Sequence, residues 1–200
     1  MIIRFTKAKH QGKHDTLTCV RSDDSMTWWP LSSHFVEHDL LHYIVETTLG
    51  LTEAFFGLIA AGRDIESFGT RDGRKDTYTK DEGDAELIVG LMQVEISDRT
   101  TYGGTPFDNT TLGGVLEGRT NLDSSDFMMM LASTCAHRGW PMPQSTSEAQ
   151  IDSIRQRMRE LSEQWRKLPQ GGSIELSFPT ADATHSDTMH ANAIQRVEAV

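Results

Sequence analysis

The residues with the clearest chemical potential form one short run, His38-Asp39-Leu40-Leu41-His42, which Glu46 follows. On an α-helix that turns about 100° per residue, His42 falls about 40° from His38, Glu46 about 80° and Asp39 about 100°. These polar side chains therefore share one stripe of the helix, and His34 extends their four-residue spacing towards the N-terminus. Imidazoles four residues apart can converge on one metal ion, with a carboxylate from the next turn or from another helix.

This spacing favours a mononuclear metal site with His38 and His42 as ligands. The third and fourth ligands are not fixed by the sequence: the candidates are Glu46, Glu53, His34 or an acid near Glu86 and Glu95 on a later helix. Imidazole and carboxylate ligands suit zinc or iron. If such a site is catalytic, a metal-activated water indicates hydrolase or lyase chemistry.

Asp39 stands where HExxH zinc enzymes carry a glutamate that acts as a base. Its side chain is one methylene shorter, so we expect Asp39 to orient a histidine from the outer shell, a role that His34 shares. A dinuclear site would need a second helix with an acid three residues before a histidine. His137 is preceded by Thr134 at that spacing, so the sequence argues against a dinuclear site.

A metal-free interpretation stays open beside the metal site. In it, His38, His42 and Glu46 form a buried hydrogen-bond network without catalysis, and the protein binds a partner through its acidic surface or the segment 66–83. A metal-free acid or base role for the histidines is a further alternative.

The segment around this stripe resembles a group of uncharacterised bacterial proteins with an HDLxHYxVE signature. The matching residues are His38 to Glu46, then Gly50-Leu51, Phe55-Phe56-Gly57-Leu58 and Ala60-Ala61-Gly62. A more distant similarity is to ubiquinone-biosynthesis proteins with an HDxxH…E zinc motif on a helical pair, which implies His38, Asp39 and His42 as ligands. Glu53 falls one residue short of that family's spacing, and Ala54 takes the expected place.

The strand pattern predicts a small antiparallel sheet. Residues 1–8, 15–21 and 25–31 are short, rich in β-branched and aromatic residues, and separated by turn formers, which indicates an N-terminal meander. Residues 173–178 alternate cleanly between apolar and polar, and we expect this late strand to lie beside the meander.

Apolar residues at helical spacing predict about five helices packed on this sheet, which makes the fold class α+β. The expected helices are one that runs from an N-cap within 32–34 to Leu49, then 53–61 with Thr52 as N-cap, 84–97, 123–137, and 145–168 with a Ser145-x-x-Glu148 capping box. Residues 66–83 carry turn formers and charges, so we expect a mobile loop there. Residues 1–179 form one expected domain, and 180–200 an expected disordered tail.

Two aromatic groups have more than one interpretation. Phe55, Phe56, Leu58 and Ile59 either line a small-molecule pocket against the histidine stripe or form ordinary core. Trp28 and Trp29 are adjacent in a strand and so point to opposite faces. We expect one of them in the core and the other under a helix or at an interface.

Composition excludes several classes of protein. The 29 acidic and 19 basic residues give a net charge of −10, which opposes binding to nucleic acid and to anionic membranes. No leader or membrane-length apolar segment is present, so we expect a cytoplasmic protein, with a homo-oligomer or a protein partner as the remaining options. The two cysteines, Cys19 and Cys135, suit neither a disulfide framework nor a thiolate zinc site.

Overall fold

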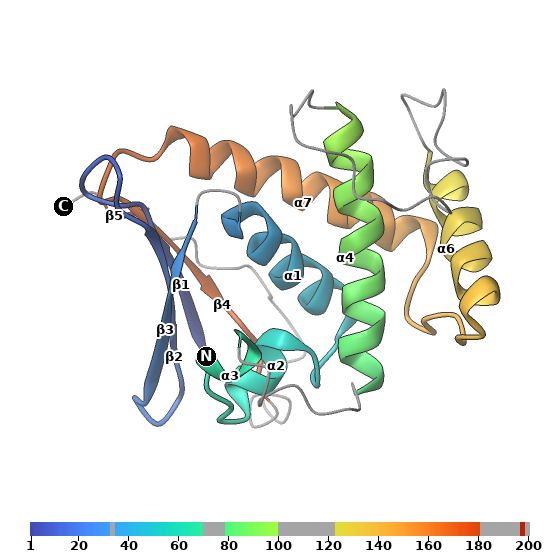
Figure 1. The fold of residues 1–200 in the computed structure, drawn as a ribbon, viewed down its shortest axis with the longest axis horizontal. Helices are drawn as coiled ribbons and strands as arrows, with labels where there is room; N and C mark the ends of the chain where they lie inside the picture. Colours follow the sequence, from blue (N-terminus) through green and yellow to red (C-terminus); the bar gives the residue numbers. More distant parts are fainter. Residues whose placement is uncertain (33–34, 70–78, 100–122, 181–196, 199–200) are drawn as a thin grey trace.

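The structure is a computed structural model that describes residues 1–32, 35–69, 79–99, 123–180 and 197–198. An antiparallel sheet with the strand order β3-β2-β1-β4-β5 carries the described helices on one face, which confirms the predicted α+β class (Figure 1). The strands are β1 (Ile2–Thr6), β2 (Asp15–Val20), β3 (Met26–Leu31), β4 (Ser173–Ser177) and β5 (Val197–Glu198).

The sheet registers explain the buried inner face. On β1, Ile3 pairs with Cys19 of β2 and Leu176 of β4, and Phe5 pairs with Leu17 and Ile174. All of these side chains are buried because alternate residues of a strand face the same side of the sheet. The predicted meander and the late strand beside it are therefore confirmed. In the expected disordered tail, 197–198 form β5, whereas 181–196 and 199–200 lie outside the described residues.

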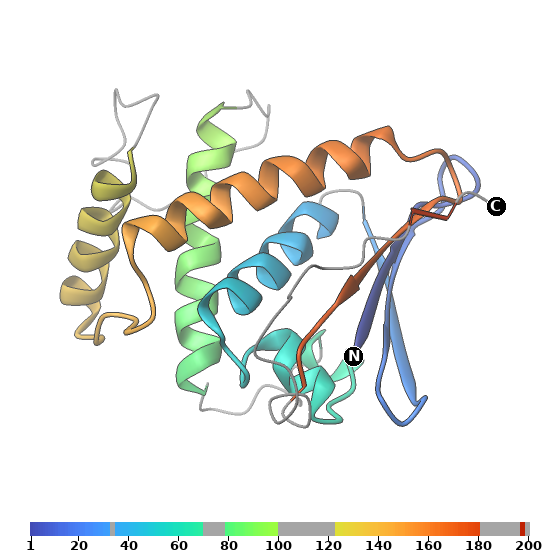
Figure 2. The ribbon, with the colours of Figure 1, turned by 180° about the vertical axis from the view of Figure 1, so that it is seen from behind.

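The described helices form layers beside the sheet. They are α1 (Phe35–Leu49), α2 (Phe55–Ala60), α3 (Glu66–Gly69), α4 (Lys80–Arg99), α6 (Ser124–Arg138) and α7 (Glu148–Lys167). α1 lies between the sheet and α4, while α7 runs across both helices and α6 lies outermost (Figures 1 and 2). α1 is thus the central helix of the fold.

Two helix starts differ from the prediction because a different cap forms. α4 begins at Lys80 rather than residue 84, since Thr79 and Glu82 make a capping box: the Glu82 amide donates to Thr79 Oγ1 at 3.0 Å, and the Thr79 amide donates to Glu82 Oε2 at 2.8 Å. α7 begins at Glu148 with Ser147, not Ser145, as N-cap. The earlier start of α4 matters for the polar stripe of α1, because α4 packs against α1 and its added first turn extends along it.

The region between α1 and α4 also corrects two predictions. α2 begins at Phe55 rather than Glu53, and Ala54 rather than Thr52 is its N-cap residue. The short helix α3 occupies 66–69, where a loop was expected, and 79–83 belong to the capped start of α4. Residues 70–78 and the glycine-containing stretch 100–122 lie outside the described part of the chain.

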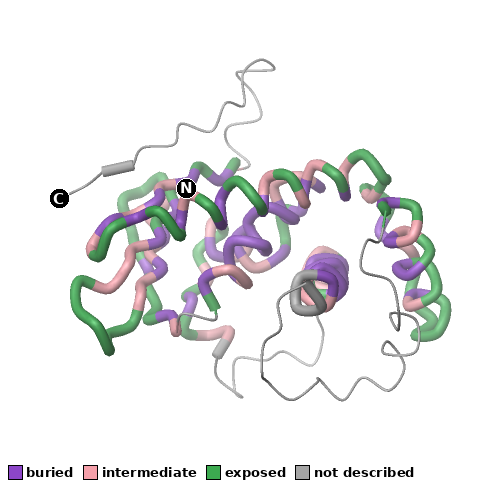
Figure 3. Tube along the Cα trace, turned by 90° about the horizontal axis from the view of Figure 1, so that it is seen from above, coloured by how far each residue is buried: buried purple, intermediate pink, exposed green. Residues whose placement is uncertain are grey.

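Burial around α1 places its polar stripe inside the protein. α4, seen end-on in Figure 3, is largely buried, and α6 at the edge is exposed on its outer side. Asp39, His42 and Glu46 are 9%, 3% and 1% exposed. None of the described helices is long and apolar enough to cross a membrane.

Candidate functional site

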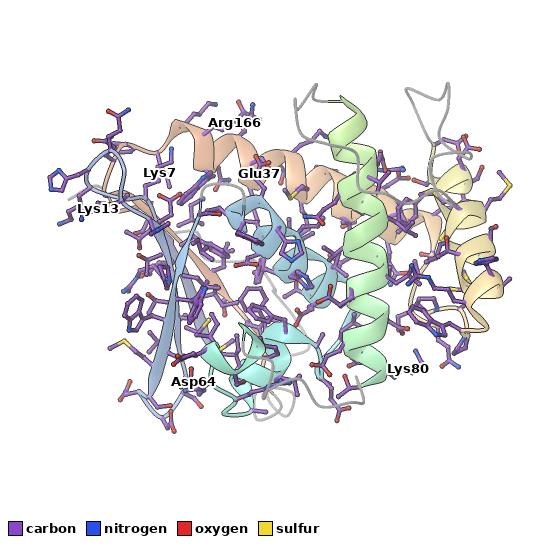
Figure 4. All side chains as sticks on the ribbon, viewed as in Figure 1. Lys7, Lys13, Glu37, Asp64, Lys80 and Arg166 are labelled. Atoms are coloured by element: carbon purple, nitrogen blue, oxygen red, sulfur yellow. The ribbon has the colours of Figure 1, made fainter. Side chains whose placement is uncertain are left out.

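An open pocket of about 1020 Å³ lies where α1, α2, α3 and the start of α4 meet the end of β3. Figure 4 labels two residues next to lining residues in the chain: Asp64, between Arg63 and Ile65, and Lys80, which follows Thr79. The polar lining side chains are His38, Asp39, His42, Arg63, Thr79, Glu82 and Glu86, and the large apolar ones are Trp29, Leu31, Phe35, Phe55, Leu58, Ile65 and Phe68. Most of the predicted histidine stripe therefore faces a pocket.

His38 is half-buried and is oriented by α4. Its Nδ1 lies 2.8 Å from Gln93 Nε2, and either tautomer of the ring is compatible with a partner that carries both an amide nitrogen and an amide oxygen. The ring centroids of His38 and His42 are 4.6 Å apart. Burial, and then the neighbouring His42, lower the pKa of His38 to about 4, so its imidazole is neutral at pH 7.

His42 is buried between two carboxyl groups. Its Nε2 lies 3.7 Å from Glu86 Oε1, and its Nδ1 lies 3.8 Å from Glu46 Oε1. Both distances exceed a hydrogen bond, and Nδ1 has no hydrogen-bond partner among the described residues. Burial lowers the pKa of His42, while the Glu86 carboxylate acts in the opposite direction. His42 is thus a neutral imidazole with an unsatisfied buried nitrogen.

The Glu46 side chain caps the start of α2 and is not part of the pocket lining. Its Oε2 accepts hydrogen bonds from the backbone N–H groups of Phe56 at 2.9 Å and Gly57 at 3.1 Å, and its Oε1 also accepts from Phe56 at 3.2 Å. These bonds satisfy amides that the first turn of a helix leaves without partners. Burial raises the pKa of Glu46 to about 8, against the lowering effect of the two N–H donors.

Asp39 contributes a second buried carboxyl group to the pocket wall. No hydrogen bond to its side chain is found among the described residues, although the residue is only 9% exposed. Burial, and then the charge of Glu86, raise the pKa of Asp39 to about 8. The group is therefore mainly protonated at pH 7 and can donate a hydrogen bond into the pocket.

The structure brings some of the sequence candidates together and separates others. His38, Asp39, His42 and Glu86 line the pocket, and Glu46 lies behind His42. Glu53 is exposed and is not a lining residue.

The other two candidates lie elsewhere. Glu95 pairs with Arg155 at 3.0 Å, and His34 lies outside the described residues. Within the described part of the chain, no three His, Cys, Asp or Glu side chains are arranged, as they stand, to hold a metal ion.

Sequence reasoning missed Gln93, Thr79 and Glu82 as parts of this region. The Thr79-x-x-Glu82 capping box was the available signal, because a helix that begins there carries Glu82 and Glu86 along α1. For Gln93, a single glutamine on a helix gives no comparable signal.

The aromatic candidates divide between core and pocket. Phe56 and Ile59 are fully buried, whereas Phe55 and Leu58 line the pocket, so each interpretation of this helix face holds for half of it. The expectation of a core tryptophan is wrong. Trp28 is 59% exposed, and Trp29 is 38% exposed at the pocket, because adjacent residues of β3 face opposite sides of the sheet and the described helices cover only one of them.

Comparisons of the chain with protein family models, curated proteins and solved structures find no match. The fold and the pocket therefore define an α+β protein with a candidate ligand site, and its function has to be argued from the side chains of that site.

Proposed function

We propose that the protein binds one zinc or iron ion in this pocket through His38 and His42, with Glu86 as the carboxylate ligand. The observation that carries the proposal is that His38 and His42 line one pocket, with ring centroids 4.6 Å apart and Glu86 Oε1 3.7 Å from His42 Nε2. Beside them, His42 Nδ1 is buried, lies 3.8 Å from Glu46 Oε1 and has no hydrogen-bond partner among the described residues.

The two histidines have the properties of metal ligands. Both are neutral at pH 7, which leaves a lone pair on each ring, and both line the same pocket. The arrangement around His42 supports coordination through Nε2, because Nδ1 faces Glu46 Oε1 at 3.8 Å, on the side where many metal-bound histidines have a carboxyl partner. Gln93 can hold the His38 ring in the corresponding way.

Glu86 is the carboxylate that the pocket offers. Its Oε1 is 3.7 Å from His42 Nε2, and its side chain is 58% exposed, so it has the freedom to rotate towards an ion. This rotation is required, since no three ligand groups of the described residues converge as they stand. A metal held by three protein ligands would keep a position open for water or substrate, as hydrolytic and lyase enzymes require.

The test is the metal affinity of the purified full chain. After removal of bound metals, titration with Zn²⁺, and with Fe²⁺ under nitrogen, should give near-stoichiometric binding to the wild type. His38→Ala and His42→Ala should abolish binding, and Glu86→Gln should weaken it by at least about tenfold. Glu86 is exposed, so its variant is expected to fold normally.

His137→Ala is the matched control, because His137 is an exposed histidine on another helix. Its affinity should equal that of the wild type. Absence of stoichiometric metal in the wild type, or equal losses in His137→Ala and His42→Ala, refutes the proposal and favours a metal-free role of the stripe.

A further inference from the structure

The part of the pocket beyond the histidines is built from aromatic rings. The Phe35 ring centroid lies 6.3 Å from that of His38, and the Phe55 centroid lies 5.9 Å from that of His42. Phe68 continues the wall, with its centroid 4.8 Å from Phe55. Aromatic surface thus begins beside both histidines and extends away from them.

Two of the lining aromatic residues are unusually exposed for their type. Phe35 is 57% exposed and Trp29 is 38% exposed. Exposed apolar surface inside a concave site is typical of a surface that a ligand covers. The volume of about 1020 Å³ leaves room for an organic molecule as well as an ion.

The charged groups in this wall neutralise each other. The Arg63 guanidinium lies 3.9 Å from the Phe68 ring centroid, and its Nη1 lies 3.2 Å from Glu82 Oε1. The aromatic part therefore offers stacking surface with its charges paired. His38, Asp39 and His42 line the pocket at the other end, where Glu86 Oε1 lies 3.7 Å from His42 Nε2.

From this division we infer that the organic ligand of the pocket has a planar, apolar body, which packs against Phe35 and Phe55, and an oxygen-rich head that binds at the histidine end. The inference rests on the proposed metal site, because the head is taken to bind the ion held by His38 and His42. Carboxylate and hydroxamate groups are heads of this kind, since their oxygens bind Zn²⁺. Rings stacked on Phe35 or Phe55 would gain the usual aromatic pair energy.

Two hydroxamates that share a head and differ in the body test this inference. The protein is first loaded with Zn²⁺ and its metal content is measured; benzohydroxamate and acetohydroxamate are then titrated by calorimetry. We expect benzohydroxamate to bind at least about tenfold more tightly, which corresponds to 1.4 kcal/mol. Zinc-free protein should bind neither compound measurably.

Phe35→Ala and Trp28→Ala form a matched pair of variants. Both side chains are exposed, so folding should be retained, but only Phe35 lines the pocket. Phe35→Ala should weaken benzohydroxamate about three- to tenfold and leave acetohydroxamate unchanged. Trp28→Ala should change neither affinity.

The outcomes separate this inference from the metal proposal. If the protein takes up no zinc, both fail at the loading step. If it takes up zinc but binds the two hydroxamates equally, or if Phe35→Ala has no effect, the planar body is refuted and the metal site stands. Equal binding of benzohydroxamate by zinc-free protein refutes the metal-bound head.

Discussion

The buried carboxyl of Glu46 predicts an unusual dependence of stability on pH. Burial raises its pKa to about 8, and the nearby acids Asp81 and Glu82 of α4 act in the same direction. In the unfolded chain a glutamate titrates near pH 4.3. Between these two values the folded state holds a proton on Glu46 that the unfolded state has lost, so the contribution of Glu46 to the free energy of unfolding falls as pH rises.

The expected slope follows from this difference. Between about pH 6 and pH 7, one such group lowers the free energy of unfolding by roughly 1.4 kcal/mol. Asp39, whose pKa is also raised to about 8, adds a slope of the same sign. The stabilising contribution of both groups is complete at acidic pH, below the unfolded values, and is lost as pH rises through about 8.

Glu46→Gln isolates the contribution of Glu46. A glutamine resembles the protonated acid in shape and keeps an oxygen to accept from the Phe56 and Gly57 amides, so it should cost about 1 kcal/mol or less. Its slope between pH 6 and pH 7 should be smaller than that of the wild type by roughly 1.4 kcal/mol. Glu46→Ala, in contrast, leaves two buried N–H groups without an acceptor, at about 1–3 kcal/mol each.

Urea denaturation followed by circular dichroism, in buffer with EDTA, measures these free energies. Equal slopes for wild type and Glu46→Gln would show that Glu46 is ionised in the folded protein at neutral pH. A wild-type free energy of unfolding that rises more with pH than that of Glu46→Gln would refute the sign of the argument. Either result would show that the Glu46 carboxyl is not held neutral in the folded protein.

The remaining predictions concern single positions with internal controls. A Cβ at Gly57 would collide with the Thr52 backbone carbonyl, so Gly57→Ala should destabilise the protein by about 1–3 kcal/mol in thermal unfolding. Gly90→Ala is the control, because a Cβ there meets nothing within 4 Å, and it should be neutral or stabilising. Ser147→Ala should cost about 0.5–2 kcal/mol because Ser147 caps α7, and Ser145→Ala should cost little; equal losses would place the cap elsewhere.

The sheet was predictable because its pattern is local. Alternation in 173–178 places Ile174 and Leu176 on one face, and both pair with residues of β1. α1 ends where Gly50 adopts a positive φ of 69° and the Leu51 amide bonds to the Glu46 carbonyl, which the Leu49-Gly50 pair indicates. Each of these signals needs only a few neighbouring residues.

The site was predictable only in part because its partners come from distant segments. The stripe of α1 located His38 and His42, but it could not say that Gln93 and Glu86 of α4 approach them, 55 and 44 positions away. The choice of Glu46 as a ligand assumed a side chain free to face the pocket. That assumption did not include the first backbone N–H groups of α2. Ala54 cannot cap them with its side chain, and Glu46 accepts their hydrogen bonds instead.

The hydrogen bonds from α2 to Glu46 also mean that the polar residues of α1 have different roles. Gly57 allows α2 to approach the Thr52 backbone closely, and this approach presents the Phe56 and Gly57 amides to Glu46. Glu46, fixed in this way, stands 3.8 Å behind His42 Nδ1 and leaves Nε2 facing the pocket. A change that moves α2 should therefore alter the ring of His42 before it alters His38, which α4 holds through Gln93. The two histidines share a spacing, but different helices position them.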